Sequence, residues 1–337
     1  MEKVHVSEEV RSVFESMNKL GASGTPYLFA VDYALQQGFI LPHPLQQNDI
    51  FFQVGAISNG LPCPQEEERT YATEEMLQLH PISYSAYLRK YQRIEKALQR
   101  GDSFLANLTL KTPIVTPFSL EQIYRRASAP YKLLLRDRFV CFSPERFVAI
   151  SEGGKRIETC PMKGTIDASL PDAEEVIRND YKETAEHYTI VDLMRNDLAR
   201  IGTNVRVEEF RYIDRVATLR GELLQVSSRI VADLSDNALE HLGDIFQALL
   251  PAGSISGAPK QATLEAIHEA EQESRGYYTG VFGYFDGSSV DSGVLIRFIE
   301  KDEKGDTFFR SGGGITINSS PKEEYEEVIQ KIYLPFH

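Results

Sequence analysis

The sequence contains no tryptophan, only three cysteines and no long apolar run. Cys63, Cys141 and Cys160 are widely spaced and form no CxxC pair, which argues against disulfides and structural zinc and favours a reducing compartment. No stretch approaches the ~18 consecutive apolar residues of a membrane span. The polar, acidic N-terminus also lacks the apolar core of a signal peptide. We therefore expect a cytoplasmic protein without a membrane partner.

Basic charge is scarce as well. The chain has 36 Lys and Arg residues against 49 Asp and Glu residues, for a formal net charge of -13. No basic stripe offsets this acidic balance, so nucleic acid is not expected as a partner. With 337 residues, of which 42% are hydrophobic, the chain can bury a substantial core as one large domain or two.

The apolar periodicity predicts a mixed fold. Early strands are expected in one first sheet, at 26–33, 38–42 and 49–57, followed by a loop rich in Pro and Glu at 59–69. Helices are expected at 83–100 with Gly101 as the stop, at 172–201 as one helix or two, near 237–250 and 259–273, and from Pro321 onward. Mixed strands with helices grouped in the later half favour the α+β class over a regular βαβ alternation.

One lysine follows a predicted strand in the run ETCPMKGT at 158–165. Pro161 and Gly164 mark a turn that would present Lys163 where strands end and ligands bind. A lysine in such a place can act as a covalent nucleophile when its amine is neutral. On this segment alone, a solvated surface lysine is the commoner explanation.

The expected last helix carries the clearest chemical pattern. Glu324, Glu327 and Lys331 recur at spacings of three and four residues after Pro321, so they share one helix face. Two carboxylates on one face repel each other unless a positive group lies between them. A metal site explains the pattern about as well as a structural arrangement, in which the acids favour the helix N-terminus and Lys331 pairs with Glu327.

Two further features invite anion binding. Arg297 interrupts the apolar strand GVLIRFIE, and a buried arginine needs an anionic partner, either a ligand or an acid of the fold. The triplet Gly312–Gly314 could present backbone N–H groups to an anion or form a plain tight turn. By contrast, the run GSISGAPK at 253–260 is no phosphate-binding loop, because two residues separate its last glycine from Lys260, and an ATP-hydrolysing enzyme is disfavoured.

Taken in order, six runs resemble the chorismate-utilising enzymes, and within that family most closely the aminodeoxychorismate synthase component I group. Besides 158–165, they are SPERF at 143–147, AEHYTIVDLMRND at 185–197, LLPAGSISGAPK at 249–260, RGYYTGVFGYFD at 275–286 and GGGITINSSPKEEYEE at 312–327. The resemblance covers about Tyr84 to the C-terminus. It implies two stacked, mainly antiparallel sheets flanked by helices, in one domain over 1–337 with a shortened N-terminal part at 1–80.

The resemblance also assigns roles to residues. It implies Mg²⁺ held by Glu186 and Glu327, with Glu324 as an outer or alternate ligand, and sparse carboxylate ligation suits this ion. Contacts to the ring carboxylate of chorismate are implied for Gly164, Thr165, Gly312, Gly313, Gly314 and Lys331. Contacts to the enolpyruvyl carboxylate are implied for Tyr278 and Arg297. From the residues alone, Glu186 and the neighbouring Glu183 could equally form a solvated helix face.

The family chemistry rests on Lys163 and Glu145. The resemblance implies that Lys163 attacks C2 of chorismate, while Glu145 protonates the departing 4-hydroxyl and would be helped if apolar surroundings raised its pKa. Attack needs a neutral amine, so we expect the pKa of Lys163 to fall. Ammonia then enters at C4. It must come from a separate glutamine amidotransferase chain, because no cysteine here lies in a Gly-x-Cys-x-Gly elbow.

Two positions separate the members of the family. Anthranilate synthases carry alanine where this chain has Lys163, and isochorismate synthases carry a lysine base where this chain has Leu105. The pattern favours amination of chorismate toward 4-aminobenzoate and folate. The alternatives are anthranilate synthase component I and a non-catalytic chorismate-binding paralogue, which would be expected to lose Lys163, Glu145 or the metal glutamates.

Overall fold

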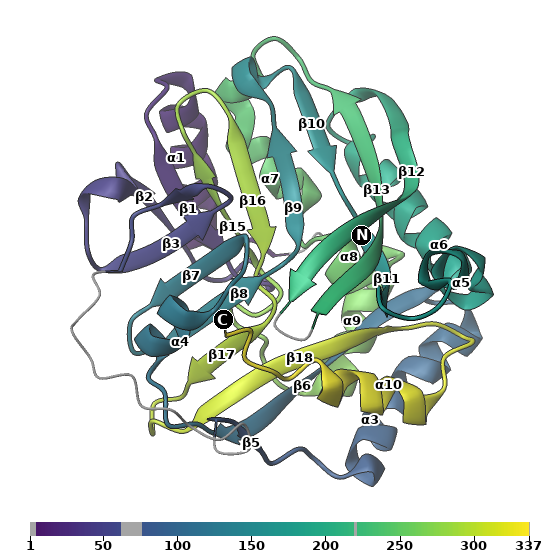
Figure 1. Ribbon diagram of the computed structural model, residues 1–337. Helices are drawn as coiled ribbons and strands as arrows, with labels where there is room; N and C mark the ends of the chain where they lie inside the picture. Colours follow the sequence, from purple (N-terminus) through teal and green to yellow (C-terminus); the bar gives the residue numbers. More distant parts are fainter. Residues whose placement is uncertain (1–4, 62–75, 219–220, 337) are drawn as a thin grey trace.

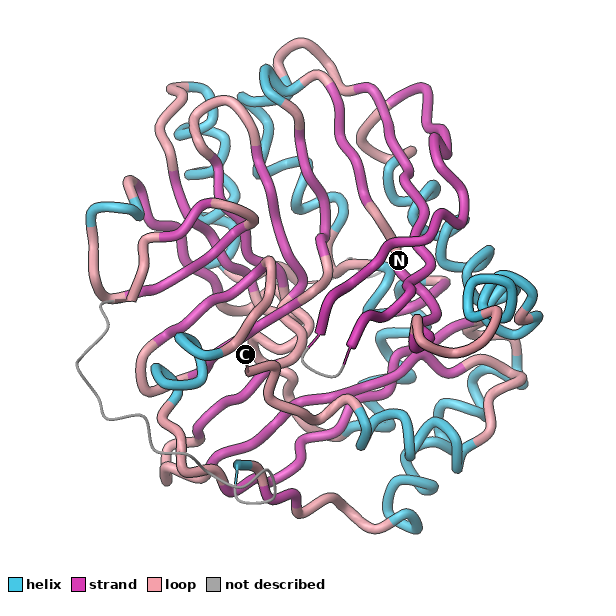
Figure 2. Tube along the Cα trace, viewed as in Figure 1, coloured by secondary structure: helices cyan, strands magenta, loops and turns pink. Residues whose placement is uncertain are grey.

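The computed structural model describes residues 5–61, 76–218 and 221–336, without the side chains of 165, 182, 216–218 and 223. The described strands form two nine-stranded sheets, shown in Figure 1 and Figure 2, and most strands lie beside a sequence-distant partner. Every pairing between described strands is antiparallel. The expected α+β class with two mainly antiparallel sheets is therefore confirmed.

The first sheet has the order β11-β13-β10-β9-β16-β15-β1-β2, with β12 paired to β13. Its strands are β1 (Tyr27–Val31), β2 (Gly38–Pro42), β9 (Arg146–Ile150), β10 (Arg156–Thr159), β11 (Met162–Asp167), β12 (Thr203–Thr218), β13 (Gly221–Asp233), β15 (Val281–Phe285) and β16 (Val290–Val294). Strand β11, which carries Lys163, lies at the end of this order.

The second sheet has the order β14-β6-β18-β17-β8-β7-β3-β4, with β5 paired to β6. Its strands are β3 (Ile50–Val54), β4 (Ile57–Ser58), β5 (Gln78–Leu79), β6 (Leu105–Val115), β7 (Tyr131–Leu135), β8 (Phe139–Ser143), β14 (Gly257–Ala258), β17 (Phe298–Lys301) and β18 (Thr307–Ile315). The expectation that 49–57 joins the first sheet is wrong, because β3 pairs with β7 in the second. Most of the loop expected at 59–69 lies outside the described residues.

The helices cover the outer faces of the sheets in Figure 1. They are α1 (Glu8–Ala22), α3 (Tyr84–Arg100), α4 (Leu120–Arg126), α5 (Ala173–Asn179), α6 (Tyr181–Leu198), α7 (Leu242–Leu249), α8 (Gly253–Ser256), α9 (Lys260–Glu271) and α10 (Pro321–Gln330). Short 3-10 turns lie at Pro44–Gln46, Glu152–Gly154 and Ala238–His241. None of the helices in the described ranges is long and apolar enough to cross a membrane.

Most of the expected helix ends are confirmed. Helix α3 begins after the Ser83 cap, whose side chain accepts the Ala86 N–H, and ends at Gly101 with φ of 78°, a conformation that glycine adopts without strain. The segment 172–201 forms two helices that meet at Asp180, whose carboxylate accepts the Glu183 N–H at 2.8 Å. This cap places the first two turns of α6, with Glu183 and Glu186, beside β11.

Separate apolar clusters lock these layers together. One packs α1, α6 and α7 against the first sheet, and another packs α3, α9 and α10 against β6 and β18. A third lies between the sheets, where Leu28 and Phe282 of the first meet Phe52 and Leu133 of the second. Full burial of such side chains contributes about 1.5–3 kcal/mol each. The site residues therefore project from elements that are fixed by extensive packing.

Candidate active site

Lys163 lies on β11 at a break in its pairing with β13. The register shifts between Met162 and Thr165, and Gly164 has φ of 87°, a left-handed conformation that favours glycine. The Lys163 Nζ atom lies 2.7 Å from Glu186 Oε2 on α6, and the two side chains are 30% and 15% exposed. The structure thus pairs Lys163 with Glu186, for which the sequence indicated only a magnesium ligand or a solvated helix face.

The expected fall in the pKa of Lys163 is wrong for this structure. Burial pulls the pKa down, but the Glu186 carboxylate beside the amine, with Glu183 and Glu327, raises it above its ordinary value overall. An amine in this state is an ammonium ion and not a nucleophile. The sequence indicated the apolar setting of the strand but not the carboxylates that converge on it.

Three glutamates from two helices, Glu183, Glu186 and Glu327, act electrostatically on this lysine. Glu183 and Glu186 project from α6, and Glu324, only 3% exposed, and Glu327 project from α10. Burial raises the pKa of Glu183, the Lys163 ammonium lowers it, and Glu186 and Glu327 raise it further. The Glu183 Oε2 atom is buried and has no hydrogen-bond partner among the described residues.

Lys331 connects α10 to the second sheet. Its Nζ lies 2.7 Å from Glu327 Oε1 and donates to the Gly312 carbonyl oxygen at 2.9 Å. The i,i+4 pair that was one explanation of the helix pattern is therefore present. The same ammonium also contributes to the field at Glu145, so its role extends beyond the helix surface.

The donor set suits a hard divalent cation. Carboxylate oxygens are the ligands that Mg²⁺ prefers, and an orphaned buried carboxylate oxygen on Glu183 shows where positive charge is lacking. Within the described residues, no three acidic, histidine or cysteine side chains lie close enough together to share one ion as they stand. Glu186 forms an ion pair with Lys163, and Glu327 forms one with Lys331. The magnesium ligands Glu186, Glu324 and Glu327 remain a prediction.

Glu145 lies in the short link between β8 and β9 and faces the same region. Its backbone is fixed at both ends, because Glu145 N–H donates to Ser143 Oγ and its carbonyl accepts the Val294 N–H, each at 3.1 Å. Burial raises the pKa of the carboxyl group, while a hydrogen bond with Ser254 and the charges of Arg297 and Lys331 oppose the rise. The condition stated for Glu145, a pKa raised by its surroundings, is met, and a carboxyl with a raised pKa suits a proton donor.

Arg297 differs from the expectation of a buried strand residue. It lies between β16 and β17 with φ of 53°, is partly exposed, and donates from Nε to Tyr333 Oη at 3.3 Å. In the part of the chain described, no carboxylate lies within ion-pair distance of its guanidinium, so the alternative of an acidic partner finds no support there. Tyr278 is 3% exposed, and burial raises its pKa to about 12.

The glycine triplet is a strand and not a turn. Gly312, Gly313 and Gly314 lie in β18, where they pair with Thr109, Leu108 and Asn107 of β6. A methyl group added at Gly313 would lie 3.3 Å from Glu324 Oε2 and 3.9 Å from Lys331 Nζ. The triplet thus lets α10 approach the sheet closely, which neither of the two turn interpretations anticipated.

These contacts bring most of the predicted residues into one site. Lys163 and Glu186 join the α10 glutamates through electrostatic contact, and Lys331 links those glutamates to Gly312 and Glu145. The Thr165 side chain lies outside the described atoms. Sequence reasoning missed Ser254, although it lies within the run LLPAGSISGAPK, and treated Glu183 only as a neighbour of Glu186.

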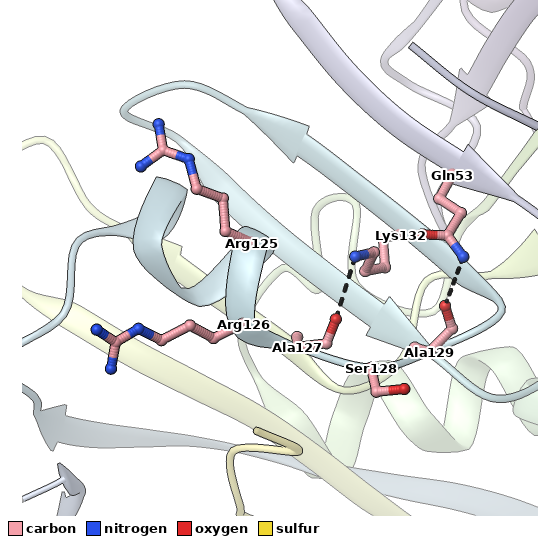
Figure 3. Close-up of a pocket in the computed structure, with 7 residues that line it drawn as sticks. All are labelled: Gln53, Arg125, Arg126, Ala127, Ser128, Ala129 and Lys132. Carbon is pink, nitrogen blue, oxygen red and sulfur yellow. Dashed lines mark hydrogen bonds between the residues drawn. The ribbon is translucent and has the colours of Figure 1, made fainter. Parts of the chain in front are cut away.

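A separate pocket contains none of these residues. It has a volume of about 360 Å³ and is lined by Gln53, Arg125, Arg126, Ala127, Ser128, Ala129 and Lys132. Figure 3 shows the two arginines pointing away from Lys132, whose ammonium donates to the Ala127 carbonyl at 3.1 Å, and Gln53 donates to Ala129. The cations do not converge, so the pocket is not a built anion site.

Comparison with known proteins gives these contacts a context. A family model described as chorismate binding enzyme matches residues 44–336. The chain is 48% identical to an uncharacterised PabA-like protein of Pasteurella multocida, over 97% of this chain and 99% of that protein. It is 33% identical to aminodeoxychorismate synthase component 1 of Bacillus subtilis, over 75% of this chain and 55% of that protein.

Solved structures agree on the fold. Anthranilate synthase component I of Streptococcus pneumoniae matches with a TM-score of 0.65 and 27% identity, covering 81% of this chain and 62% of that one. The menaquinone-specific isochorismate synthase MenF of Escherichia coli matches with a TM-score of 0.69 over 97% of this chain and 81% of that one, at 16% identity, which supports the fold alone. The chain belongs to the family of chorismate-binding enzymes.

Proposed function

We propose that this protein is aminodeoxychorismate synthase component I, which converts chorismate and ammonia to 4-amino-4-deoxychorismate for the synthesis of 4-aminobenzoate and folate. The observation that carries the proposal is the position of Lys163, whose amine lies 2.7 Å from Glu186 beside the other glutamates of α6 and α10. The similarity to the Bacillus subtilis synthase, over three quarters of this chain, supports it.

In the proposed reaction, Lys163 is the nucleophile and Glu145 is the acid. The neutral Lys163 amine forms a bond to C2, the ring double bonds shift, and the C4–O bond breaks as Glu145 gives its proton to the leaving hydroxyl, which departs as water. Ammonia then bonds to C4, the double bonds shift back, and Lys163 leaves C2 as a neutral amine. The new ammonium group returns a proton to Glu145, so both residues are restored.

The other residues hold the substrate during these steps. Arg297 and Tyr278 would bind the enolpyruvyl carboxylate, because a planar guanidinium matches a carboxylate at two points. Lys331 and the backbone of Gly312–Gly314, with Gly164 and Thr165, would contact the ring carboxylate. A magnesium ion held by Glu186 and Glu327, with Glu324 nearby, would bind that carboxylate and offset the negative charge that keeps Lys163 protonated.

The proposal includes a partner and a setting. We propose that ammonia is supplied by a glutamine amidotransferase on another chain, in the cytoplasm, and that residues 1–337 form a single chorismate-binding domain. The relatives named as component 1 of synthases support the partner. The free thiols of Cys141 and Cys160 support a reducing compartment.

The test is turnover of chorismate by purified protein with Mg²⁺ and ammonium at mildly alkaline pH, with the products separated by chromatography. The wild type is expected to form 4-amino-4-deoxychorismate, and Lys163→Ala is expected to lose at least about a thousandfold in rate. The control is Lys260→Ala. Lys260 is also a largely buried lysine, paired at 3.7 Å with Asp197, but it contacts none of the proposed site residues that the structure describes.

Each outcome is informative. Loss of product in Lys163→Ala together with retained turnover in Lys260→Ala would support the covalent lysine. Anthranilate or isochorismate from the wild type would keep the family but reject the proposed product. Full activity in Lys163→Ala would exclude the lysine as nucleophile.

A further inference from the structure

Arg275 is the most completely satisfied buried cation of the described chain. Its side chain is 1% exposed, and it forms a two-point ion pair with Glu271 at the end of α9, through Nε at 2.9 Å and Nη2 at 2.7 Å. The face of the guanidinium also stacks over the Tyr33 ring, 4.3 Å from its centre. An arginine buried this deeply persists only where its charge and donors are all matched.

The remaining donors of Arg275 reach three different segments. Nη2 donates to the Asn107 carbonyl of β6 at 2.6 Å, and Nη1 donates to the Ile255 carbonyl of α8 at 3.1 Å and to Thr279 Oγ1 at 3.3 Å. Glu271 Oε1 strengthens the hold on β6, because it accepts both the N–H and the hydroxyl of Thr109. The Arg275 side chain therefore connects one strand, β6, one helix, α8, and the loop that contains Thr279.

Each of these segments carries part of the proposed site. Ser254, which hydrogen-bonds to Glu145, directly precedes Ile255. Tyr278 directly precedes Thr279, and Asn107 pairs with Gly314 in the glycine triplet. Arg275 itself touches none of the proposed reacting groups among the described residues, so any influence on the reaction must act through these neighbours.

The Thr279 backbone gives a second sign of constraint. Its φ is 61°, a left-handed conformation that costs of order 1 kcal/mol for a β-branched residue. The Thr279 hydroxyl donates to the Tyr278 carbonyl at 2.6 Å while accepting from Arg275, and the Thr279 N–H donates to the Leu295 carbonyl at 2.8 Å, two residues before Arg297. The strained loop is thus held between Arg275 and the segment that carries the other carboxylate-binding candidate.

We propose that Arg275 is a positioning residue that sets the relative placement of Tyr278, of Ser254 with Glu145, and of β6 beside the glycine triplet of β18. The predicted effect on kcat rests on the proposed function, whereas the predicted effect on the Kd requires only that the protein binds chorismate. A lysine cannot replace Arg275, because an ammonium offers three donors from one point whereas the planar guanidinium reaches Glu271 and three separate acceptors at once.

The experiment compares Arg275→Lys with Arg310→Lys. Arg310 lies on β18, is 5% exposed, and pairs with Glu300 at 2.9 Å while donating to the Ser274 carbonyl. It is therefore a second buried, ion-paired arginine. Its backbone pairs with β6, but its described side-chain contacts, to Glu300, Glu273 and the Ser274 carbonyl, reach none of the three segments that the Arg275 side chain holds. Both variants keep the charge and lose the guanidinium fork, so the comparison separates positioning from general stability.

Two quantities are measured on the full chain, the chorismate Kd by calorimetry with Mg²⁺ and the kcat with ammonium, alongside the thermal unfolding midpoint. For Arg275→Lys we expect the Kd to rise and the kcat to fall, together by about 10- to 100-fold, because displacement by an ångström costs rates of this order. For Arg310→Lys we expect less than about a threefold change in either quantity, at a comparable loss of thermal stability.

Thr279→Val provides a variant for the case in which Arg275→Lys does not fold. Valine has the same shape and removes only the hydroxyl link between Arg275 and the Tyr278 carbonyl, so we expect a smaller loss, in chorismate affinity above all. Equal losses in Arg275→Lys and Arg310→Lys, or wild-type Kd and kcat in Thr279→Val, would overturn the proposal. A wild type that binds chorismate but forms no amino product would instead refute the proposed function, and the Kd comparison would still decide the role of Arg275.

Discussion

The carboxylate cluster predicts a stabilisation by magnesium that can be measured without turnover. Glu183 and Glu186 of α6 and Glu327 of α10 lie near the ammonium groups of Lys163 and Lys331, and Glu183 Oε2 has no hydrogen-bond partner among the described residues. Mg²⁺ at 100 times its Kd stabilises the folded state by about 2.7 kcal/mol. An unfolding entropy of about 2.1 cal/mol/K per residue gives about 0.7 kcal/mol/K for 337 residues, and hence a rise in Tm of about 4 °C.

The assay is thermal unfolding with and without millimolar Mg²⁺, for the wild type, Glu186→Gln and Glu326→Gln. Glu186→Gln should lose the magnesium shift. Without metal it should also be less stable by about 1–2 kcal/mol, because Lys163 loses a half-buried partner. Glu326 lies on α10, is 55% exposed and pairs only at 3.9 Å with Lys322, so its variant should keep the full shift.

The reasoning would be refuted by an equal magnesium shift in the wild type and in Glu186→Gln. A shift that disappears in Glu326→Gln as well would point to non-specific screening of the acidic chain. Calcium in place of magnesium serves as a further comparison, because it accepts more ligands at longer distances.

Three further predictions concern single residues. Burial raises the pKa of Asp32, so its carboxyl binds a proton more tightly in the folded state, and its contribution to stability falls as pH rises through that pKa. The variant Asp32→Asn keeps an acceptor for the turn, so its stability relative to the wild type, measured by urea unfolding, should improve from about pH 4 to pH 8. A decline over that range would contradict this. Arg297→Lys should raise the KM for chorismate by about 10-fold or more with a smaller effect on kcat, and an unchanged KM would remove Arg297 from the binding site. Gly313→Ala places a methyl group 3.3 Å from Glu324, so Mg²⁺ affinity measured by calorimetry should weaken, and unaltered affinity would show that α10 shifts freely.

Local patterns in the sequence predicted the helices well because each helix carries its own signals. In α3, apolar residues recur on one face between a serine cap and a glycine stop, and the structure places both ends as expected. Helix α1 was missed although Val10, Val13, Phe14 and Met17 lie at helical spacing and are buried. The acidic first turn of that helix argues against a signal peptide, but together with the Ser7 cap it is also typical of a helix N-terminus.

Local sequence patterns do not show which strands pair when the strands lie far apart in the chain. The β-branched and aromatic residues of β3 favour a strand, but its partner β7 lies about 80 residues later and decides which sheet it joins. The glycine triplet illustrates the same limit, because three glycines suggest a turn until β6 is available as a partner. Arg297 resembled a buried strand residue because its neighbours are apolar, whereas its positive φ breaks the strand there.

The sequence predicts which residues belong to the site but not the protonation state of Lys163. The motifs select Lys163, Glu145 and the glutamates as one set, and described contacts join Lys163 to Glu186 and Lys331 to Glu327. Their roles stay predictions. The direction of the Lys163 pKa depends on three carboxylates carried by two other helices, and only their combined approach reverses the effect of burial. At Glu145 burial is the largest effect and outweighs the opposing charges of Arg297 and Lys331, so its pKa is raised.

The pairing of β1 with β15 has a consequence for how the protein is made in the cell. Tyr27 lies opposite Phe285, so the N-terminal strand has no sheet neighbour on that side until some 250 residues more have been synthesised. On a ribosome that adds about 5–20 residues per second, β1 can pair early with β2 on its other edge but waits for many seconds before β15 is available. Chaperones that hold nascent chains should therefore bind this protein early, at its N-terminal segment, and release it only when the last third of the chain has emerged.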